Sequence, residues 1–136
     1  MNNILLSIVG LGVVLLLCGA CTGGRQIGNG SAPEDFMQFY QRFHRDSLFQ
    51  RSRVRFPLDG YRIEGGRITA WSGADWAPHR NGLEAIDTTV YRIERLRGEG
   101  EIREKIYQDQ GGLLIERHFR LLDQRWWLTF YLYVFL

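Results

Sequence analysis

The sequence RWWLTFYLYVFL, residues Arg125–Leu136, is the most apolar strand-like stretch of this chain. Its aromatic and β-branched residues favour a β-strand. Successive side chains of a strand point to opposite faces, and here both faces carry bulky groups. Because a strand with two bulky faces is usually covered on both sides, we expect this one at the centre of a sheet, with a helix on one side.

Several stretches upstream predict further strands. Arg53–Leu58 alternates arginine with apolar residues, so Val54, Phe56 and Leu58 should face the core. Pro57 cannot donate a hydrogen bond to a neighbouring strand, which predicts that this strand lies at an edge or ends there. Two more strands are expected at residues 88–96 and 113–122, with turns at 98–100 and 123–124. Residues 101–107 suit either a helical turn or a charged edge strand, and the neighbouring strands and turns favour a strand.

The clearest local pattern is a β-hairpin in Tyr61–Trp71. Gly65-Gly66 supplies the positive φ angles of a two-residue type I′ turn. Folding about this turn pairs Glu64 with Arg67 and, one step further, two isoleucines. An opposite-charge pair beside an aliphatic pair stabilises neighbouring strands. Asp59-Gly60 predicts a turn just before the hairpin.

An aromatic helix precedes the strands. Four aromatic residues recur at helical spacing and form one apolar face, which we expect to pack on the sheet: Phe36, Phe39, Tyr40 and Phe43. Ser31 and Glu34 have the spacing of a capping box, which predicts a helix from there to about Asp46. A short second helical turn is expected at residues 47–51, with Leu48 and Phe49 facing inward.

These elements predict a single α+β domain over residues 33–136. One long and one short helix would pack on a curved antiparallel sheet of five or six strands. Roughly 105 residues can bury a core of useful size. Both cysteines precede the domain, which excludes a disulfide framework, thiol catalysis and a cysteine-ligated metal within it.

Residues 1–20 resemble the signal peptide of a bacterial lipoprotein. The apolar run Ile4–Leu17 is shorter than the roughly 20 residues that span a bilayer, and matches a signal-peptide core. Small residues then precede Cys21, as in the lipobox, where the cysteine thiol takes a diacylglycerol and the new amino terminus is acylated, for example with palmitate. Cys18 replaces the usual leucine, and residues 1–3 carry no positive charge. The alternatives are an uncleaved signal anchor and an ordinary secretory peptide.

This resemblance implies an address and an anchor. Several acyl chains hold a protein stably on a membrane, whereas one does not. Residues 21–32 would be a flexible tether. Thr22 is not the aspartate that retains some lipoproteins at the inner membrane, so the bacterial outer membrane is the expected site. The expected partners are the membrane, through lipidated Cys21, and an envelope protein or glycan.

The charge pattern indicates a solvated surface. The formal net charge is +2, and nearly all positive charge comes from arginines that alternate with acids. We therefore expect no nucleic-acid partner. An arginine face that meets lipid phosphates or an acidic glycan is an alternative.

The sequence offers few candidates for catalysis or binding. The histidines His44, His79 and His118 share no short spacing, so neither a metal site nor a cofactor is expected. Asp75 and His79, in the irregular stretch 72–83, could act as an acid–base pair beside a carbonyl. The other interpretation is a loop of scattered polar residues. Trp71 and Trp76 flank this stretch and could stack on a sugar or peptide, or simply close the end of the sheet.

The pattern Phe49-Gln50-x-x-Arg53-Val54-x-Phe56-Pro57-Leu58, after a short aromatic helix, resembles a family of uncharacterised bacterial lipoproteins known only as a domain of unknown function. Trp126-Trp127-Leu128 is similar to that family's last strand. The resemblance covers about Asp35 to Phe135, apart from residues 72–83. It implies a cystatin-like, nuclear-transport-factor-like fold, and it implies no catalytic residues.

Three functions follow as hypotheses. The first is a membrane-anchored envelope lipoprotein with a non-enzymatic role in binding or assembly. The second is a small pocket enzyme that uses Asp75 and His79. The third is a structural dimerisation module, which a large exposed apolar patch would favour.

Overall fold

The computed structural model describes residues 32–136. The predicted signal peptide, the predicted lipidation residue Cys21 and nearly all of the predicted tether, including Ser31, lie outside the described residues. Among the helices of the described part, none combines the length and the apolar character needed to cross a bilayer.

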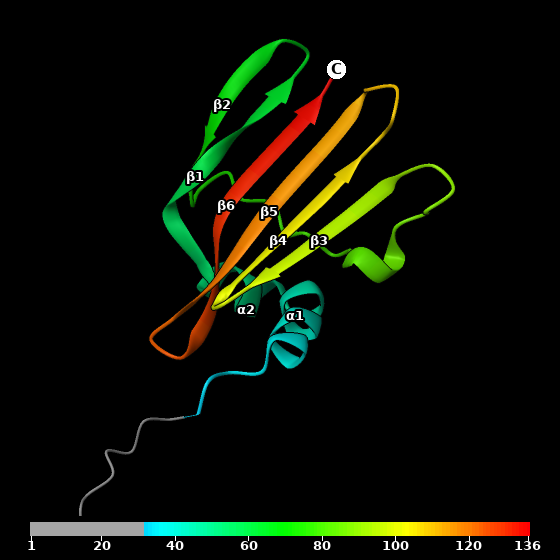
Figure 1. The fold of residues 1–136 in the computed structure, drawn as a ribbon. Coiled ribbons are helices and arrows are strands. Elements are labelled where there is room, and N and C mark those ends of the chain that lie inside the picture. The colour runs from blue at the N-terminus through cyan, green and yellow to red at the C-terminus, as the bar shows by residue number, and fades with distance from the viewer. Residues whose placement is uncertain (1–31) are drawn as a thin grey trace, which may run out of the picture. The chain divides into compact units, whose positions relative to one another are not determined.

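Two helices pack on a six-stranded sheet, which confirms the predicted α+β class (Figure 1). Along the sheet the strand order is β2-β1-β6-β5-β4-β3. The elements, in chain order, are α1 (Phe36–Arg45), α2 (Ser47–Ser52), β1 (Val54–Glu64), β2 (Arg67–Trp71), the 3₁₀ turn η1 (Leu83–Ala85), β3 (Arg92–Gly98), β4 (Glu101–Tyr107), β5 (Leu113–Leu122) and β6 (Arg125–Phe135).

The strand β6 lies inside the sheet, as its composition predicts. It pairs antiparallel with β5 and parallel with β1, so the sheet is mixed rather than wholly antiparallel. Residues 72–91 carry the chain from β2 to the far edge of the sheet, and the meander β3–β6 then returns to β1. Because no hairpin joins β1 to β6, nothing local forces them to be antiparallel.

The strand β1 is longer than predicted and is not an edge strand. Its hairpin with β2 has the expected register, and Gly65 and Gly66 have φ of 55° and 77°. Gly60, however, lies in a bulge and not in a turn: its φ is +93°, and a Cβ there would lie 2.2 Å from the carbonyl oxygen of Tyr131. Pro57 falls where the pairing with β6 changes register, so its missing N–H interrupts no regular ladder.

The helices begin at aspartates. Asp35 caps α1 by accepting a 2.8 Å hydrogen bond from the backbone N–H of Gln38, and Asp46 caps α2. The predicted capping partner Glu34 instead forms two hydrogen bonds with Arg53, of 2.8 and 3.0 Å. The expectation that Leu48 faces inward is wrong, since it is 80% exposed.

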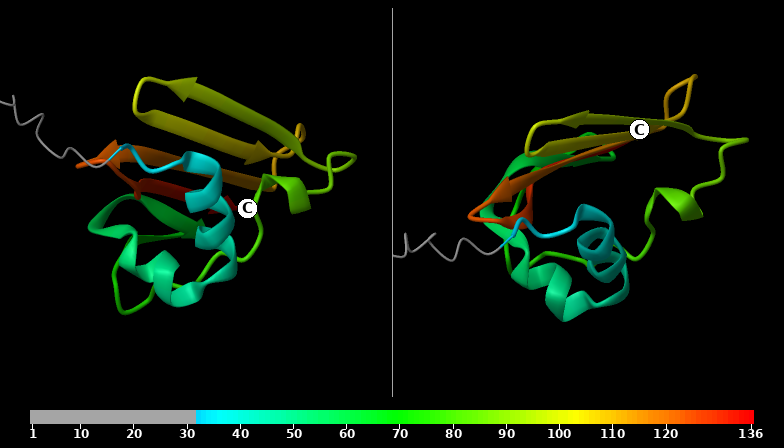
Figure 2. Two further views of the ribbon diagram at one scale, coloured as in Figure 1. Left: turned by 90° about the horizontal axis from the view of Figure 1, so that it is seen from below. Right: turned by 60° about the horizontal axis from the view of Figure 1, so that its bottom comes forward.

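The sheet curves around α1, whose aromatic face forms the core (Figure 2). Phe119 of β5 is fully buried at its centre. Its ring lies 5.5–5.8 Å from all four helix aromatics. The prediction that both faces of β6 are covered is correct for the face toward the helices only. The opposite face is half-buried.

The strand β3 begins at Arg92 rather than at residue 88, because Asp87 binds Thr89 in a turn.

Candidate functional site

A cluster of buried polar side chains lies between α1 and strands β3 to β5. Glu104 is at its centre and is 1% exposed. Its Oε1 accepts hydrogen bonds from Arg95, and its Oε2 lies 3.0 Å from Nη2 of Arg117 and accepts a 3.1 Å bond from the hydroxyl of Tyr40. The pairing of the strands explains this arrangement, since Glu104 is opposite Arg95 on β3 and opposite Arg117 on β5.

The cluster contains more positive than negative charge. Two guanidinium groups, of Arg95 and Arg117, share the single carboxylate of Glu104. Arg117 is 3% exposed, and its Nε and Nη2 are buried without a hydrogen-bond acceptor among the described residues. Although Nη2 is within ion-pair distance of Glu104, the angle is too poor for a hydrogen bond. Burying a polar group without a hydrogen-bond partner costs free energy, so such groups are rare in folded proteins.

Two histidines border the cluster. The ring of His44, on α1, donates from Nδ1 to the backbone carbonyl of His79 at 3.1 Å, so its proton is on Nδ1 and Nε2 is an acceptor. That Nε2 and Nδ1 of His79 are both buried without a partner in the described part of the chain. Gln50 holds the loop in place: it donates to the carbonyl of His79 and accepts from its N–H, at 2.7 and 2.8 Å.

Burial keeps the rings and phenols of this region neutral. Burial, followed by the nearby charge of Arg117, lowers the pKa of His44 to about 4 and that of His79 to about 3. Burial also raises the pKa of both Tyr40 and Tyr131 to about 12. At neutral pH the charges of the cluster are therefore those of the arginines and Glu104.

A small cavity of about 70 Å³ opens beside the histidines. It is bounded by the end of α1, by α2 and by the loop after Trp76, and it has room for a few non-hydrogen atoms. Its lining residues are Phe43, His44, Arg45, Ser47, Gln50, Pro78, His79 and Arg80.

Acid should destabilise the domain through these histidines. In the unfolded chain their pKa values return to about 6.5, so between pH 6.5 and 4 the unfolded state binds more protons than the folded state. Each histidine then removes about 1.4 kcal/mol of stability per pH unit as the pH falls. We expect the urea midpoint to fall steeply from pH 7 to pH 5, and less steeply in His44→Gln. An equal midpoint at both pH values would contradict this assignment.

The structure separates the predicted acid–base pair. Asp75 is exposed and its carboxylate accepts a 2.6 Å hydrogen bond from Ser72. His79 instead packs against Tyr131 and Trp76, with ring centroids 4.3 and 4.7 Å apart. Within residues 32–136, no hydrogen bond or ion pair joins Asp75 to His79. Catalysis by this pair stays a prediction.

Trp71, at the end of β2, and Trp76, in the following loop, pack on each other. Their rings lie 5.8 Å apart, edge to face, and Trp76 is 5% exposed. Trp71 donates from its indole N–H to the carbonyl of Tyr131 at 2.6 Å. Stacking on a ligand and closure of the end of the sheet both stay predictions for these two residues.

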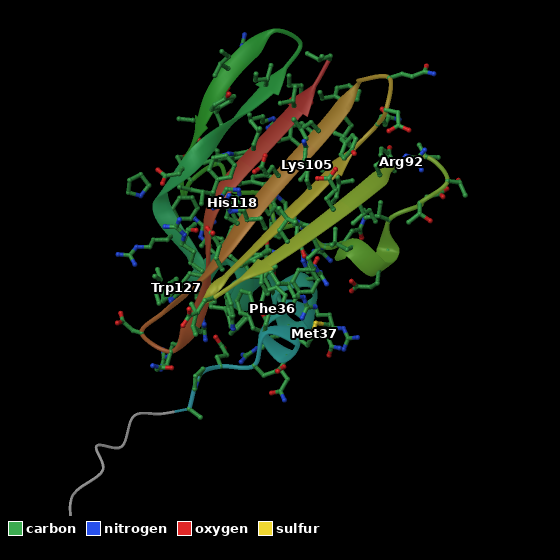
Figure 3. All side chains as sticks on the ribbon, viewed as in Figure 1. Phe36, Met37, Arg92, Lys105, His118 and Trp127 are labelled. Atoms are coloured by element: carbon green, nitrogen blue, oxygen red, sulfur yellow. The ribbon has the colours of Figure 1, made fainter. Side chains whose placement is uncertain are left out.

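The outer face of the sheet carries an apolar row. One line of paired residues crosses all six strands and is apolar or aromatic in five of them: Ile68, Ile63, Val134, Leu114 and Tyr107, then Arg92. Lys105, His118 and Trp127 lie on β4, β5 and β6 of the same sheet (Figure 3). The row is an exposed apolar surface of the kind that the dimerisation hypothesis requires, and that hypothesis stays a prediction.

The buried cluster contradicts the prediction that the arginines and acids of the strands form a solvated surface. Glu104 lies between Ile102 and Ile106 on one face of β4, and all three side chains are buried. Period-two alternation could have placed it, and Arg117 opposite it, on the inward face. No group of three or more possible metal-ligating side chains occurs in the part of the chain that the structure describes.

Two solved structures share the fold. A crystal structure of an NTF2-like protein from Bacteroides fragilis matches with a TM-score of 0.50 and 18% sequence identity, over 76% of this chain and 48% of that chain. An NMR structure of a protein from Bacteroides uniformis matches with a TM-score of 0.54 and 24% identity, over 75% of this chain and 78% of that chain. This chain thus spans about half the length of the B. fragilis protein.

These likenesses show the fold alone, which is NTF2-like, as the sequence resemblance implied. A scan against protein-family models finds no match, and a search of curated proteins finds none. Membership of the lipoprotein family therefore stays a prediction.

Proposed function

We propose that this chain is a membrane-anchored lipoprotein of the bacterial cell envelope whose domain binds a ligand or partner without catalysing a reaction. Lipidated Cys21 would hold it on the outer membrane, and residues 21–32 would let the domain reach an envelope protein, a glycan or a small molecule. The lipobox-like residues before Cys21 support the anchor.

The engagement of Glu104 carries the non-enzymatic part of this proposal. It is the one carboxylate that is buried among the described residues. Both of its oxygens are engaged, by two arginines and by the hydroxyl of Tyr40. A general base must be free to take a proton from a substrate. Hydrogen-bond and ion-pair donors already contact both oxygens of Glu104, so the cluster is better built for recognition than for proton transfer.

The anchor is tested by replacing the lipidated cysteine. We expect the full chain, expressed in a Gram-negative host, to enter the detergent phase, to lack residues 1–20 and to carry acyl mass. Cys21→Ala should lose the acyl mass and leave the detergent phase, because its thiol is the attachment atom. Cys18→Ala is the matched control, three residues away, and should remain lipidated.

The two cysteines also give the outcome that would overturn the anchor. If Cys21→Ala partitions and weighs as the unchanged chain does, or if Cys18→Ala alone loses the lipid, then Cys21 is not the lipidation residue. Intact-mass measurement separates these results directly.

A further inference from the structure

We propose that a groove on the outer face of the sheet, between β1, β5 and β6, binds a sugar unit that carries a carboxylate, such as a uronic-acid unit of an acidic glycan. This inference rests on the proposed binding role of the domain and names the class of ligand. The groove has a volume of about 420 Å³, much larger than that of the cavity beside the histidines. At roughly 30 Å³ for each non-hydrogen atom, it has room for one sugar ring with its substituents.

The groove lies where the regular pairing of the sheet is interrupted. Between two pairs of facing residues of β1 and β6, residues 55–58 of β1 lie opposite Thr129 alone. The register also shifts between β1 and β2, and between β5 and β6, next to this stretch. Irregularities of this kind are common beside functional sites, because they redirect side chains and end the regular ladder. Three of them together form a recess in an otherwise continuous surface.

Four polar side chains line this groove from one face of the sheet. They are Arg55 and Asp59 of β1, Arg120 of β5 and Thr129 of β6. Each of them directly follows a residue of the buried core in its own strand. Because successive side chains of a strand point to opposite faces, all four lie on the face away from α1.

The charged groups of the groove have few partners of their own. Within residues 32–136, neither Arg55 nor Asp59 forms a hydrogen bond or an ion pair through its side chain, and both are exposed. Arg120 donates from Nε to Glu101 at 3.0 Å, and the same carboxylate also binds Arg103. These five groups together carry one positive charge in excess, which suits a ligand with a single carboxylate.

The lining residues favour a sugar over a simple acid. Arg55 and the free edge of Arg120 can form paired hydrogen bonds with a carboxylate. Asp59 would repel a bare anion, but it accepts hydrogen bonds from the hydroxyl groups of a sugar. An apolar wall in a site with a few polar groups suits the C–H face of a sugar ring. This wall consists of Phe56, Pro57 and Leu122.

The test is an NMR titration of the domain with matched probes. Residues 31–136 form one compact unit with their own core, so the domain can be used without the leader. We expect methyl β-glucuronide or its galacturonide epimer to bind saturably and to shift the amide signals of residues 55–59 and 120–130. Methyl β-glucoside has the same ring without the carboxylate, so it should bind at least about 10-fold more weakly. Lactate and inorganic phosphate should also bind more weakly.

These probes also give the results that would overturn the ligand class. Lactate or phosphate that binds as tightly as the uronides would show a general anion site. Equal affinity for the glucoside would show that the carboxylate is not recognised. The absence of saturable binding by both uronides would contradict the assignment altogether.

Three variants locate the site, and all three change exposed side chains. Arg55→Met should weaken uronide binding at least about 10-fold, because it removes the paired donors. Asp59→Ala should weaken uronide binding, since the hydroxyl acceptors are lost, but should strengthen phosphate binding, since a repelling charge is lost. Arg92→Met, on the far edge strand β3, is the matched control and should bind normally.

Unchanged uronide affinity in Arg55→Met would overturn the site. A change of the same sign for both probes in Asp59→Ala would overturn the role of Asp59 as a hydroxyl acceptor. Neither result affects detergent partitioning of the full chain, so failure of this inference is distinguishable from failure of the proposed anchor.

Discussion

Glu104→Gln will destabilise the domain by about 3–5 kcal/mol, because it leaves the buried guanidinium of Arg117 and the partly exposed guanidinium of Arg95 without a counter-charge. The side chain is 1% exposed and contacts both Arg95 and Arg117. Glutamine has the same size, so the loss is one of charge and not of packing. Urea unfolding followed by tryptophan fluorescence measures the change.

Two further variants make this result specific. Glu116→Gln removes a half-exposed carboxylate on the neighbouring strand and should cost less than about 1 kcal/mol. The double variant Glu104→Gln with Arg117→Met also removes one of the two cations that lack a counter-charge. Much of the lost free energy of unfolding should therefore return. A Glu104→Gln domain as stable as the unchanged one would show that the cluster is screened by solvent, contrary to its burial.

Phe119→Ala will destabilise the domain by about 3–5 kcal/mol, the usual cost of deleting a buried aromatic ring. Phe119 is fully buried, and its ring lies within 5.8 Å of the ring centroids of Phe36, Phe39, Tyr40 and Phe43. Its removal would leave a cavity where the helix meets the sheet. Because Phe119 contacts all four aromatic residues of α1, we also expect the helix to lose protection from hydrogen exchange.

The control for this prediction is an apolar residue of the same sheet whose side chain is mostly exposed. Leu96 is 65% exposed on β3, and Leu96→Ala should change the free energy of unfolding by less than about 0.5 kcal/mol. Similar losses for the two variants would mean that Phe119 is not the centre of the core.

The elements that the sequence predicts well are those that local patterns determine. The register of the hairpin follows from Gly65-Gly66, because only a few residues adopt the required φ angles. The inward face of α1 follows from the spacing of its four aromatics. The interior position of β6 follows from its composition.

The features that the sequence does not predict depend on contacts between distant segments. The spacing of Glu34 predicts a helix cap, but in the folded chain its carboxylate binds Arg53 and the backbone N–H of Trp126 instead. The local sequence predicts a turn at Gly60. In the structure the carbonyl of Tyr131, which is distant in the sequence, lies directly against this glycine. The buried cluster combines one residue from each of several elements, so no local spacing predicts it. Only the inward orientation of Glu104 is predictable, from the alternation of side chains along β4.

The parallel pair of β1 and β6 has a consequence for how the chain acquires its structure. The first and last strands of the domain are neighbours in the sheet, so folding must at some stage close a loop that contains nearly all of the domain. Topologies of this kind fold slowly, because the entropy of loop closure is lost before the contacts form. Until β6 arrives, β1 and β5 each present an unpaired edge that can pair with another chain. A polypeptide released without its last strand should therefore aggregate rather than fold in part.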